Sequence, residues 1–208
     1  MEHLKILMVT RNTLQESLVF EAVNELHNHA TADEIYELIV KKYPGISKGT
    51  VYRNLNKLAR ILKENKLVIA TAESCTGGLL SSRLTDVSGS SDFVKLNFVT
   101  YANEAKEEIL NVPHEILESY GAVSSQCAEA MAKGLRKRTG CDIALCTTGI
   151  AGPTGGSREK PVGLMYVSAF YKDKMLLKEI RMYPKTPRKL MKFLFTQKAI
   201  DAALEVLT

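Results

Sequence analysis

Two segments of the chain place hydroxyl side chains beside glycines, and the first is the heptapeptide AESCTGG at 72–78. It follows a short apolar run and precedes a helical pattern, so its side chains are expected beyond the carboxyl edge of a sheet and at a helix N-terminus. Backbone N–H groups at such a turn stabilise negative charge. Ser74 could therefore act as a nucleophile whose developing oxyanion is held by these amides. Taken alone, a turn of small residues is more often a simple helix cap.

The second segment is TTGIAGPTGGS at 147–157, which holds four glycines within eight residues. Backbone amides of such a loop can surround a phosphate or a carboxylate, and Lys160 just beyond it would help an anion bind. The loop lacks the GK[ST] of a Walker motif, and it lacks a GxGxxG before a helix. A plain flexible loop is the alternative interpretation.

A nucleophilic serine needs a base, and the histidines do not provide one. His3, His27 and His29 lie in the N-terminal part, and His114 follows Pro113 in a predicted turn, so a Ser–His–Asp triad is not expected. A buried lysine can have its pKa lowered enough to accept the serine proton. Lys106 lies one helical turn inside a predicted strand-to-helix junction at the same sheet edge. On spacing alone, an exposed helix lysine is the competing interpretation.

The composition is that of a globular protein, with 208 residues, 45% hydrophobic and 25% charged. This length suits one sizeable domain, or a small module and a medium one. The four cysteines form no CxxC pair, which indicates reduced thiols and no metal site. No apolar run is long enough for a membrane span or a signal peptide, so a cytoplasmic protein that does not contact a membrane is expected.

Residues 58–208 alternate between strand and helix patterns, which predicts the α/β class. Helices are expected through Leu79 and Leu84, from a cap at Asn103, from a cap at Ser124, and from 186 or 187 to 207. The expected strands are 66–72, 98–101, 142–147 and a hairpin of 162–171 with 175–182. The predicted fold is a three-layer α/β/α sandwich.

Residues 1–57 read as a small all-α module of the helix-turn-helix kind. Thr13 begins one predicted helix, and Thr31 with Glu34 forms a capping box for a second. Ser47 begins a third helix after a tight turn at Gly45, with Val51, Leu55 and Leu58 facing inward. The residues at 41–66 include eight lysines and arginines but one acid, Glu64, which is a pattern that can meet a phosphate backbone or form a solvated helix face.

The segment HNHATADEIYELIVKKYPGISKGTVYRNLNKL resembles the DNA-binding half of ferric-uptake-regulator-type repressors. The resemblance covers about 50 residues, and it implies an incomplete winged helix, because the wing and the metal-binding dimerisation domain of that family do not follow. Two roles stay open for this module: DNA binding, and completion of the helical layer of the second domain. The DNA contacts that the resemblance implies are Lys48, Thr50, Tyr52, Arg53 and Asn56.

The motifs AESCTGG, SGSSDF, VTYANEAK, YGAVS and TGIAGPTGGSREKPVG resemble, in order and spacing, the CinA C-terminal domain family. The resemblance implies a nicotinamide-nucleotide amidase, which converts nicotinamide mononucleotide to nicotinic acid mononucleotide and ammonia. It places the nucleophile at Ser74, the lysine base at Lys106 and Tyr101 nearby. It also implies a homodimer, and a hydrolysis that needs no metal and no other cofactor.

The resemblance further implies a substrate-binding set, made by the two glycine-containing segments and a lysine: Cys75, Thr76, Gly77, Gly78, Thr148, Gly149, Gly152, Gly155, Gly156 and Lys160. Leu96, Asn97 and Arg158 depart from the family pattern and could change the shape of the site. The alternative function is a DNA-binding regulator in which the amidase-like domain senses a pyridine nucleotide.

Overall fold

The computed structural model describes residues 48–208, with side chains from Arg53 onward. The chain divides into two compact units, Met1–Tyr52 and Arg53–Thr208. The predicted helices before residue 47, and the side chains of Lys48, Thr50 and Tyr52, lie outside the described part. The predicted domain boundary between residues 57 and 58 would fall inside helix α3 (Lys48–Glu64), and the domain limits stay a prediction.

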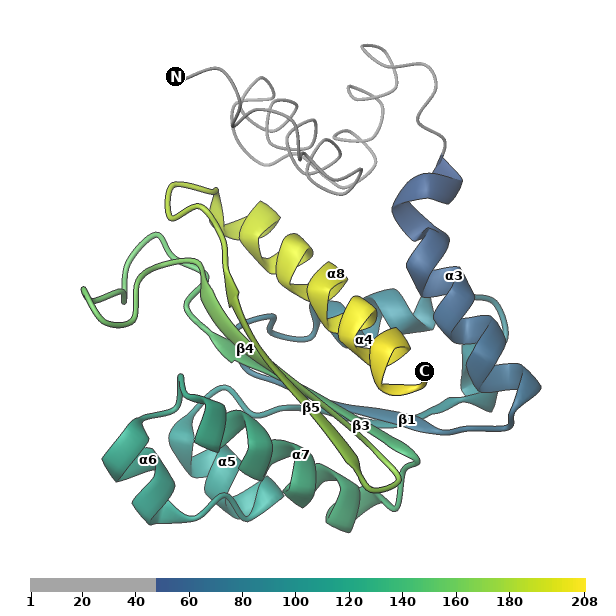
Figure 1. Ribbon diagram of the computed structural model, residues 1–208, viewed down its shortest axis with the longest axis horizontal. Coiled ribbons are helices and arrows are strands. Elements are labelled where there is room, and N and C mark those ends of the chain that lie inside the picture. The colour runs from purple at the N-terminus through teal and green to yellow at the C-terminus, as the bar shows by residue number, and fades with distance from the viewer. Residues whose placement is uncertain (1–47) are drawn as a thin grey trace, which may run out of the picture. The chain divides into compact units, whose positions relative to one another are not determined.

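A mixed five-stranded sheet forms the centre of the second unit, in the order β2-β1-β3-β4-β5 (Figure 1). The strands are β1 (Ile69–Glu73), β2 (Val94–Val99), β3 (Ile143–Gly149), β4 (Leu164–Tyr171) and β5 (Lys174–Arg181). β1 runs parallel to both β2 and β3, whereas β3, β4 and β5 are antiparallel to their successive neighbours. The carboxyl ends of β1, β2 and β3 therefore meet at one edge.

Helices cover both faces of this sheet, which confirms the predicted α/β sandwich. The helices are α4 (Leu79–Thr85), α5 (Asn103–Leu110), α6 (His114–Tyr120), α7 (Ser125–Thr139) and α8 (Arg188–Val206), with a 3-10 turn η1 (Ser90–Asp92). Helices α3, α4 and α8 lie on one face and α5, α6 and α7 on the other (Figure 1).

Three local expectations were wrong. The second strand begins at Val94, because on an edge strand the polar Lys95 and Asn97 interrupt the apolar pattern. Helix α5 is capped by Ala102, whose carbonyl accepts the first helical hydrogen bond from Lys106 N, so Asn103 is already helical. His114 begins helix α6 and does not lie in a turn.

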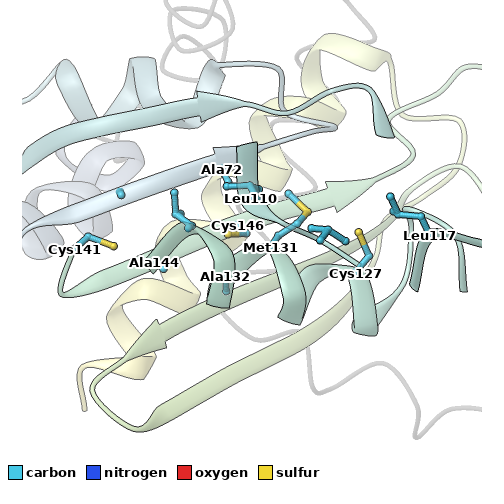
Figure 2. Packing of buried hydrophobic residues seen from close by; sticks show 12 residues of the cluster. Ala72, Leu110, Leu117, Cys127, Met131, Ala132, Cys141, Ala144 and Cys146 are labelled. Atoms are coloured by element: carbon cyan, nitrogen blue, oxygen red, sulfur yellow. The ribbon is translucent and has the colours of Figure 1, made fainter. Parts of the chain in front are cut away.

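The Ser124 cap is confirmed, since its hydroxyl accepts a hydrogen bond from Cys127 N at 3.1 Å. Helix α7, which this cap begins, packs its apolar face against β1 and β3. Figure 2 shows Met131, Cys127 and Cys146 in this core, together with Ala72 and Leu110. All four cysteines are free thiols and buried, as expected for reduced thiols.

Gly134 in the middle of α7 allows α5 to approach closely. A Cβ at this position would lie 1.8 Å from the carbonyl oxygen of Leu110, the last residue of α5. Glycine normally weakens a helix by about 1 kcal/mol relative to alanine. Here the clash with backbone outweighs that gain, because α5 would have to move.

Gly134→Ala is therefore expected to lower the free energy of unfolding by about 1–3 kcal/mol, as overpacking does elsewhere. Denaturant unfolding followed by circular dichroism measures this change. Lys137→Ala, at an exposed position of the same helix, is the control and should be neutral. An increase in stability for Gly134→Ala would show that α5 and α7 are not held at this distance.

Candidate active site

The turn between β1 and α4 holds Ser74 at the carboxyl edge of the sheet. Ser74 N donates to the carbonyl oxygen of Thr147 on β3 at 3.0 Å, and Gly77 N donates back to the carbonyl oxygen of Ser74 at 3.1 Å. Gly77 and Gly78 have φ values of 57° and 90°, which favour glycine. Ser74 is 8% exposed, so the residue is largely enclosed by the protein.

Glu73, the last residue of β1, organises this turn with a fully buried carboxylate. Its oxygens accept hydrogen bonds from the backbone N–H groups of Gly78 and Leu80, each at 3.0 Å, and of Ser81 at 2.7 Å. The hydroxyl of Ser81 donates to the same carboxylate at 2.5 Å. The carboxylate thus occupies the positive end of α4, where an anion is favoured. Sequence reasoning missed this role, although an acid directly before a helix-opening turn was visible.

Because Glu73 accepts the hydrogen bond of the Gly78 N–H, this donor is not available to a ligand at the turn. Gly77 N and Leu79 N donate to the carbonyl oxygens of Ser74 and Thr76. Within residues 48–208, the N–H groups of Cys75 and Thr76 donate to no backbone carbonyl oxygen. These two adjacent donors follow Ser74 directly, which is where an acyl-transfer site needs them.

Glu73→Gln is expected to lower the free energy of unfolding by about 2–4 kcal/mol, since each hydrogen bond to a charged group is worth roughly 1.5–3 kcal/mol. The amide NH₂ would also face backbone donors in place of an acceptor. Chemical denaturation measures the loss, and Glu115→Gln, exposed on α6, serves as the control. Equal stability of both variants would mean that the carboxylate does not hold the turn.

Lys106 on α5 extends its amine to Ser74. Its side chain is 1% exposed, and Nζ lies 3.4 Å from Ser74 Oγ. The same amine donates to backbone carbonyl oxygens that follow β2, those of Thr100 at 2.9 Å, Tyr101 at 3.1 Å and Ala102 at 3.4 Å. The interpretation of Lys106 as an exposed helix lysine is therefore wrong.

Two opposing effects act on the Lys106 amine. Burial, the larger effect, lowers its pKa, because a cation loses its hydration there. Electrostatic interaction with Cys127, Cys75 and Glu104 acts in the opposite direction and raises the pKa. A neutral amine in this position has a lone pair that can accept the hydroxyl proton of Ser74. Lowered pKa and contact with a serine are together the properties of a general base.

Cys75, next to Ser74, is the other conceivable nucleophile. Its thiol is buried, and desolvation raises its pKa to about 12, although a hydrogen bond with Thr147 acts in the opposite direction. Cysteine attacks as a thiolate, which this environment disfavours at neutral pH. Thr76, the next residue, contacts Thr147 through the two hydroxyls at 2.8 Å, a further link between the turn and β3.

Arg188, which the sequence did not indicate, connects Tyr101 to the glycine-rich loop at 147–157. Tyr101 is 61% exposed, and its hydroxyl lies 3.4 Å from the guanidinium of Arg188, at the start of α8. The same guanidinium donates to the carbonyl oxygen of Gly152 at 2.6 Å. Arg188 is 87 residues from Tyr101 in sequence, so no local pattern could have paired them.

The other predicted loop residues have different surroundings. The hydroxyl of Thr148 donates to the carbonyl oxygen of Ala122 at 2.7 Å. Lys160 directs its amine to the carbonyl oxygen of Tyr120 at 2.5 Å. Gly149 is half-buried, and a Cβ there would lie 2.5 Å from Leu164 O, so the residue allows β4 to approach. Gly155 and Gly156 are exposed.

Of the three departures from the family pattern, Asn97 contacts the site indirectly. Its side-chain oxygen accepts from the N–H and the hydroxyl of Thr71, at 3.1 and 3.0 Å. The Thr71 hydroxyl contacts that of Ser81 at 2.8 Å, and Ser81 donates to Glu73. Asn97 is thus connected through Thr71 and Ser81 to the carboxylate of Glu73, the residue before Ser74. Leu96 and Arg158 are exposed, and nothing in the structure assigns them a role.

Neither a metal site nor a membrane-spanning helix is found among the described residues, 48–208. No group of three or more histidine, cysteine or acidic side chains there could hold a metal ion. None of the helices within residues 48–208 is long and apolar enough to cross a membrane.

A mixed α/β sandwich with a buried serine–lysine pair at the carboxyl edge of its sheet is the class that fold and site define. The sequence model of the CinA C-terminal domain matches residues 52–207, and the chain therefore belongs to this family. A second model, that of the ferric uptake regulator family, matches residues 8–74.

Known relatives agree with this assignment. A CinA-like protein of Dictyoglomus thermophilum is 53% identical over 122 residues, which are 59% of this chain and 30% of the relative. The chain thus spans less than a third of the length of that relative. The crystal structure of the competence/damage inducible protein CihA from Agrobacterium tumefaciens is 36% identical, with a TM-score of 0.74 over 79% of this chain and 99% of that one. A CinA superfamily protein from Escherichia coli is 30% identical, with a TM-score of 0.71 over 78% and 94% of the two chains.

Proposed function

We propose that the protein is an amidohydrolase that converts nicotinamide mononucleotide to nicotinic acid mononucleotide and ammonia. The observation that carries the proposal is the contact of 3.4 Å between Ser74 Oγ and the buried amine of Lys106. A serine beside a lysine of lowered pKa is an activated nucleophile. Membership of the CinA family supports the proposal, and the choice of substrate rests on the family resemblance.

In the first half-reaction, neutral Lys106 accepts the hydroxyl proton as Ser74 Oγ attacks the carboxamide carbon. The carbonyl oxygen becomes an oxyanion in the tetrahedral intermediate. The C–N bond then breaks, protonated Lys106 transfers its proton to the departing nitrogen, and ammonia leaves. Ser74 is left as an acyl ester of the nicotinate group, with Lys106 neutral again.

In the second half-reaction, water attacks the ester while Lys106 accepts one of its protons. Collapse of this intermediate releases nicotinic acid mononucleotide, and Ser74 Oγ regains a proton from Lys106. The N–H groups of Cys75 and Thr76 stabilise the oxyanion in both steps. Because Glu73 fixes the following turn of backbone, these donors are held in place before the substrate binds, which is the condition for efficient stabilisation.

The direct test is release of ammonia from nicotinamide mononucleotide by the purified full-length protein. The protein should release ammonia and nicotinic acid mononucleotide in equal amounts, and chromatography separates the nucleotide product from the substrate. We expect the activity to persist in the presence of a metal chelator, because the proposed steps use only Ser74, Lys106 and backbone amides. A protein that binds the nucleotide and releases no ammonia would contradict the proposal.

A second candidate function is a DNA-binding regulator whose CinA-type domain senses a pyridine nucleotide. It is favoured by the match of the ferric uptake regulator family to residues 8–74 and by the exposed side chains of Arg53 and Asn56 on α3. Gel-shift experiments with genomic fragments at two salt concentrations test it, because binding through phosphates falls steeply with salt. Retardation that changes when nicotinamide mononucleotide is added would support this function, and no retardation at low salt would exclude it.

A further inference from the structure

Helix α8 places Lys192 beside the turn that carries Ser74 and Arg188 beside Gly152 and Tyr101. Arg188 and Lys192 are four residues apart and therefore lie on one face of the helix. Arg188 contacts both the glycine-rich loop, at Gly152 O, and the hydroxyl of Tyr101. These contacts use two of the five N–H donors of the guanidinium and leave others available to a ligand.

The amine of Lys192 lies directly against the β1–α4 turn. A Cβ on Gly77 would be 3.1 Å from Lys192 Nζ. Gly77 N donates to the carbonyl oxygen of Ser74, so the amine lies within one tight turn of the proposed nucleophile. The absence of a side chain at Gly77 leaves room for this amine.

No carboxylate within residues 53–208 neutralises these two cations. In this part of the chain, neither Arg188 nor Lys192 forms an ion pair. The carboxylate of Glu73 already accepts four hydrogen bonds, from Gly78, Leu80 and Ser81. Lys160, the lysine that the sequence suggested for an anion, donates to Tyr120 O. The uncompensated positive charge beside Ser74 is therefore that of α8.

We infer that Arg188 and Lys192 form a phosphate-binding subsite, which holds the 5′-phosphate of the nucleotide substrate while the carboxamide lies at Ser74. This inference rests on the proposed function for the identity of the nucleotide. Arginine binds phosphate through paired N–H groups and lysine binds it as a point charge. Anchoring the phosphate positions the rest of the substrate for attack, which is how remote binding energy assists the reaction.

The test compares ligands with and without the phosphate. Calorimetric titration of the Ser74→Ala protein, which cannot turn over, uses nicotinamide mononucleotide, nicotinamide riboside and inorganic phosphate. With both cations present, the mononucleotide should bind about 10- to 100-fold more tightly than the riboside. Arg188→Met and Lys192→Met should each reduce this ratio by about tenfold and leave riboside affinity unchanged.

Lys137→Met, which removes an exposed lysine from α7 on the opposite face of the sheet, is the matched control and should keep the full ratio. Competition by inorganic phosphate alone should weaken in both α8 variants. Phosphate discrimination that survives in Arg188→Met and Lys192→Met, with the fold intact by circular dichroism, would overturn the inference.

The titration separates this inference from the proposed function. Phosphate-dependent binding without ammonia release by the protein that retains Ser74 would contradict the amidase and leave the subsite standing. Ammonia release with a KM for the mononucleotide that neither α8 variant changes would contradict the subsite and leave the amidase standing.

Discussion

Ser74→Ala is expected to lower kcat for ammonia release from nicotinamide mononucleotide by about 10³-fold or more, as removal of a nucleophile does in serine hydrolases. The reason is that the other two candidates at the turn are disfavoured: burial raises the pKa of the Cys75 thiol to about 12, and the Thr76 hydroxyl is buried and contacts Thr147. The fold should be retained, because Lys106 keeps its three carbonyl acceptors when the hydroxyl is removed. Steady-state kinetics with a coupled ammonia assay measures the loss, and thermal unfolding confirms the fold.

The neighbouring residue provides the control for this experiment. Cys75→Ala keeps the backbone N–H that is proposed to hold the oxyanion, and it removes a thiol whose pKa is raised to about 12 by burial. It should retain activity within about tenfold of the wild-type protein, the cost of a small packing change at the site. If Cys75→Ala lost activity as Ser74→Ala is expected to, or if Ser74→Ala stayed active, the nucleophile would not be Ser74.

Lys106→Met is expected to lower kcat by about 10²- to 10⁴-fold, the usual contribution of a general base. In the wild-type protein the rate should rise with pH, because the neutral amine is the active form and its fraction grows as pH passes through the pKa. Burial lowers that pKa, so the rise should occur at lower pH than the titration of an exposed lysine. The residual activity of Lys106→Met should lose this rise. Rate measurements across pH, at saturating substrate, give the profile.

Lys106→Arg separates a base from a fixed positive charge. Arginine stays protonated throughout the accessible pH range. It could keep the carbonyl contacts of the lysine, yet it cannot accept the proton of Ser74. Loss of activity in both variants would support the base, whereas activity in Lys106→Arg with an unchanged pH profile would show that Lys106 acts by its charge alone.

Helix α3 belongs to both family matches, which overlap at residues 52–74. Its Leu55, Leu58 and Leu62 are buried within the second unit, and Asn54 donates to Asp201 on α8 at 2.7 Å. Arg53 and Asn56 on the same helix are exposed. The helix that was predicted to read DNA is thus also a structural part of the CinA-type domain.

Much of the fold could be read from local patterns. The strand-turn-helix at Ser74, the cap at Ser124 and the final hairpin depend on residues that are close in sequence, so hydrophobic period, glycines and caps predict them. The same motif made Ser74 a candidate nucleophile, although the turn taken alone favours a simple helix cap. Local patterns gave the wrong start for β2, because an edge strand needs only a partly apolar sequence. They also gave the wrong cap for α5, because the helix begins at the backbone carbonyl of Ala102, one residue before Asn103.

Only the tertiary structure decided how the site is assembled. Lys106 has the sequence pattern of an exposed helix lysine, and the packing of α5 against the sheet edge brings its amine to a serine 32 residues away. From helix α8, Lys192 reaches the same turn and Arg188 reaches Gly152 and Tyr101. The buried carboxylate of Glu73 has a role only because α4 folds over it. Such contacts depend on the order of the strands in the sheet and on the face of the sheet that each helix covers. The spacing of neighbouring residues in the sequence determines neither.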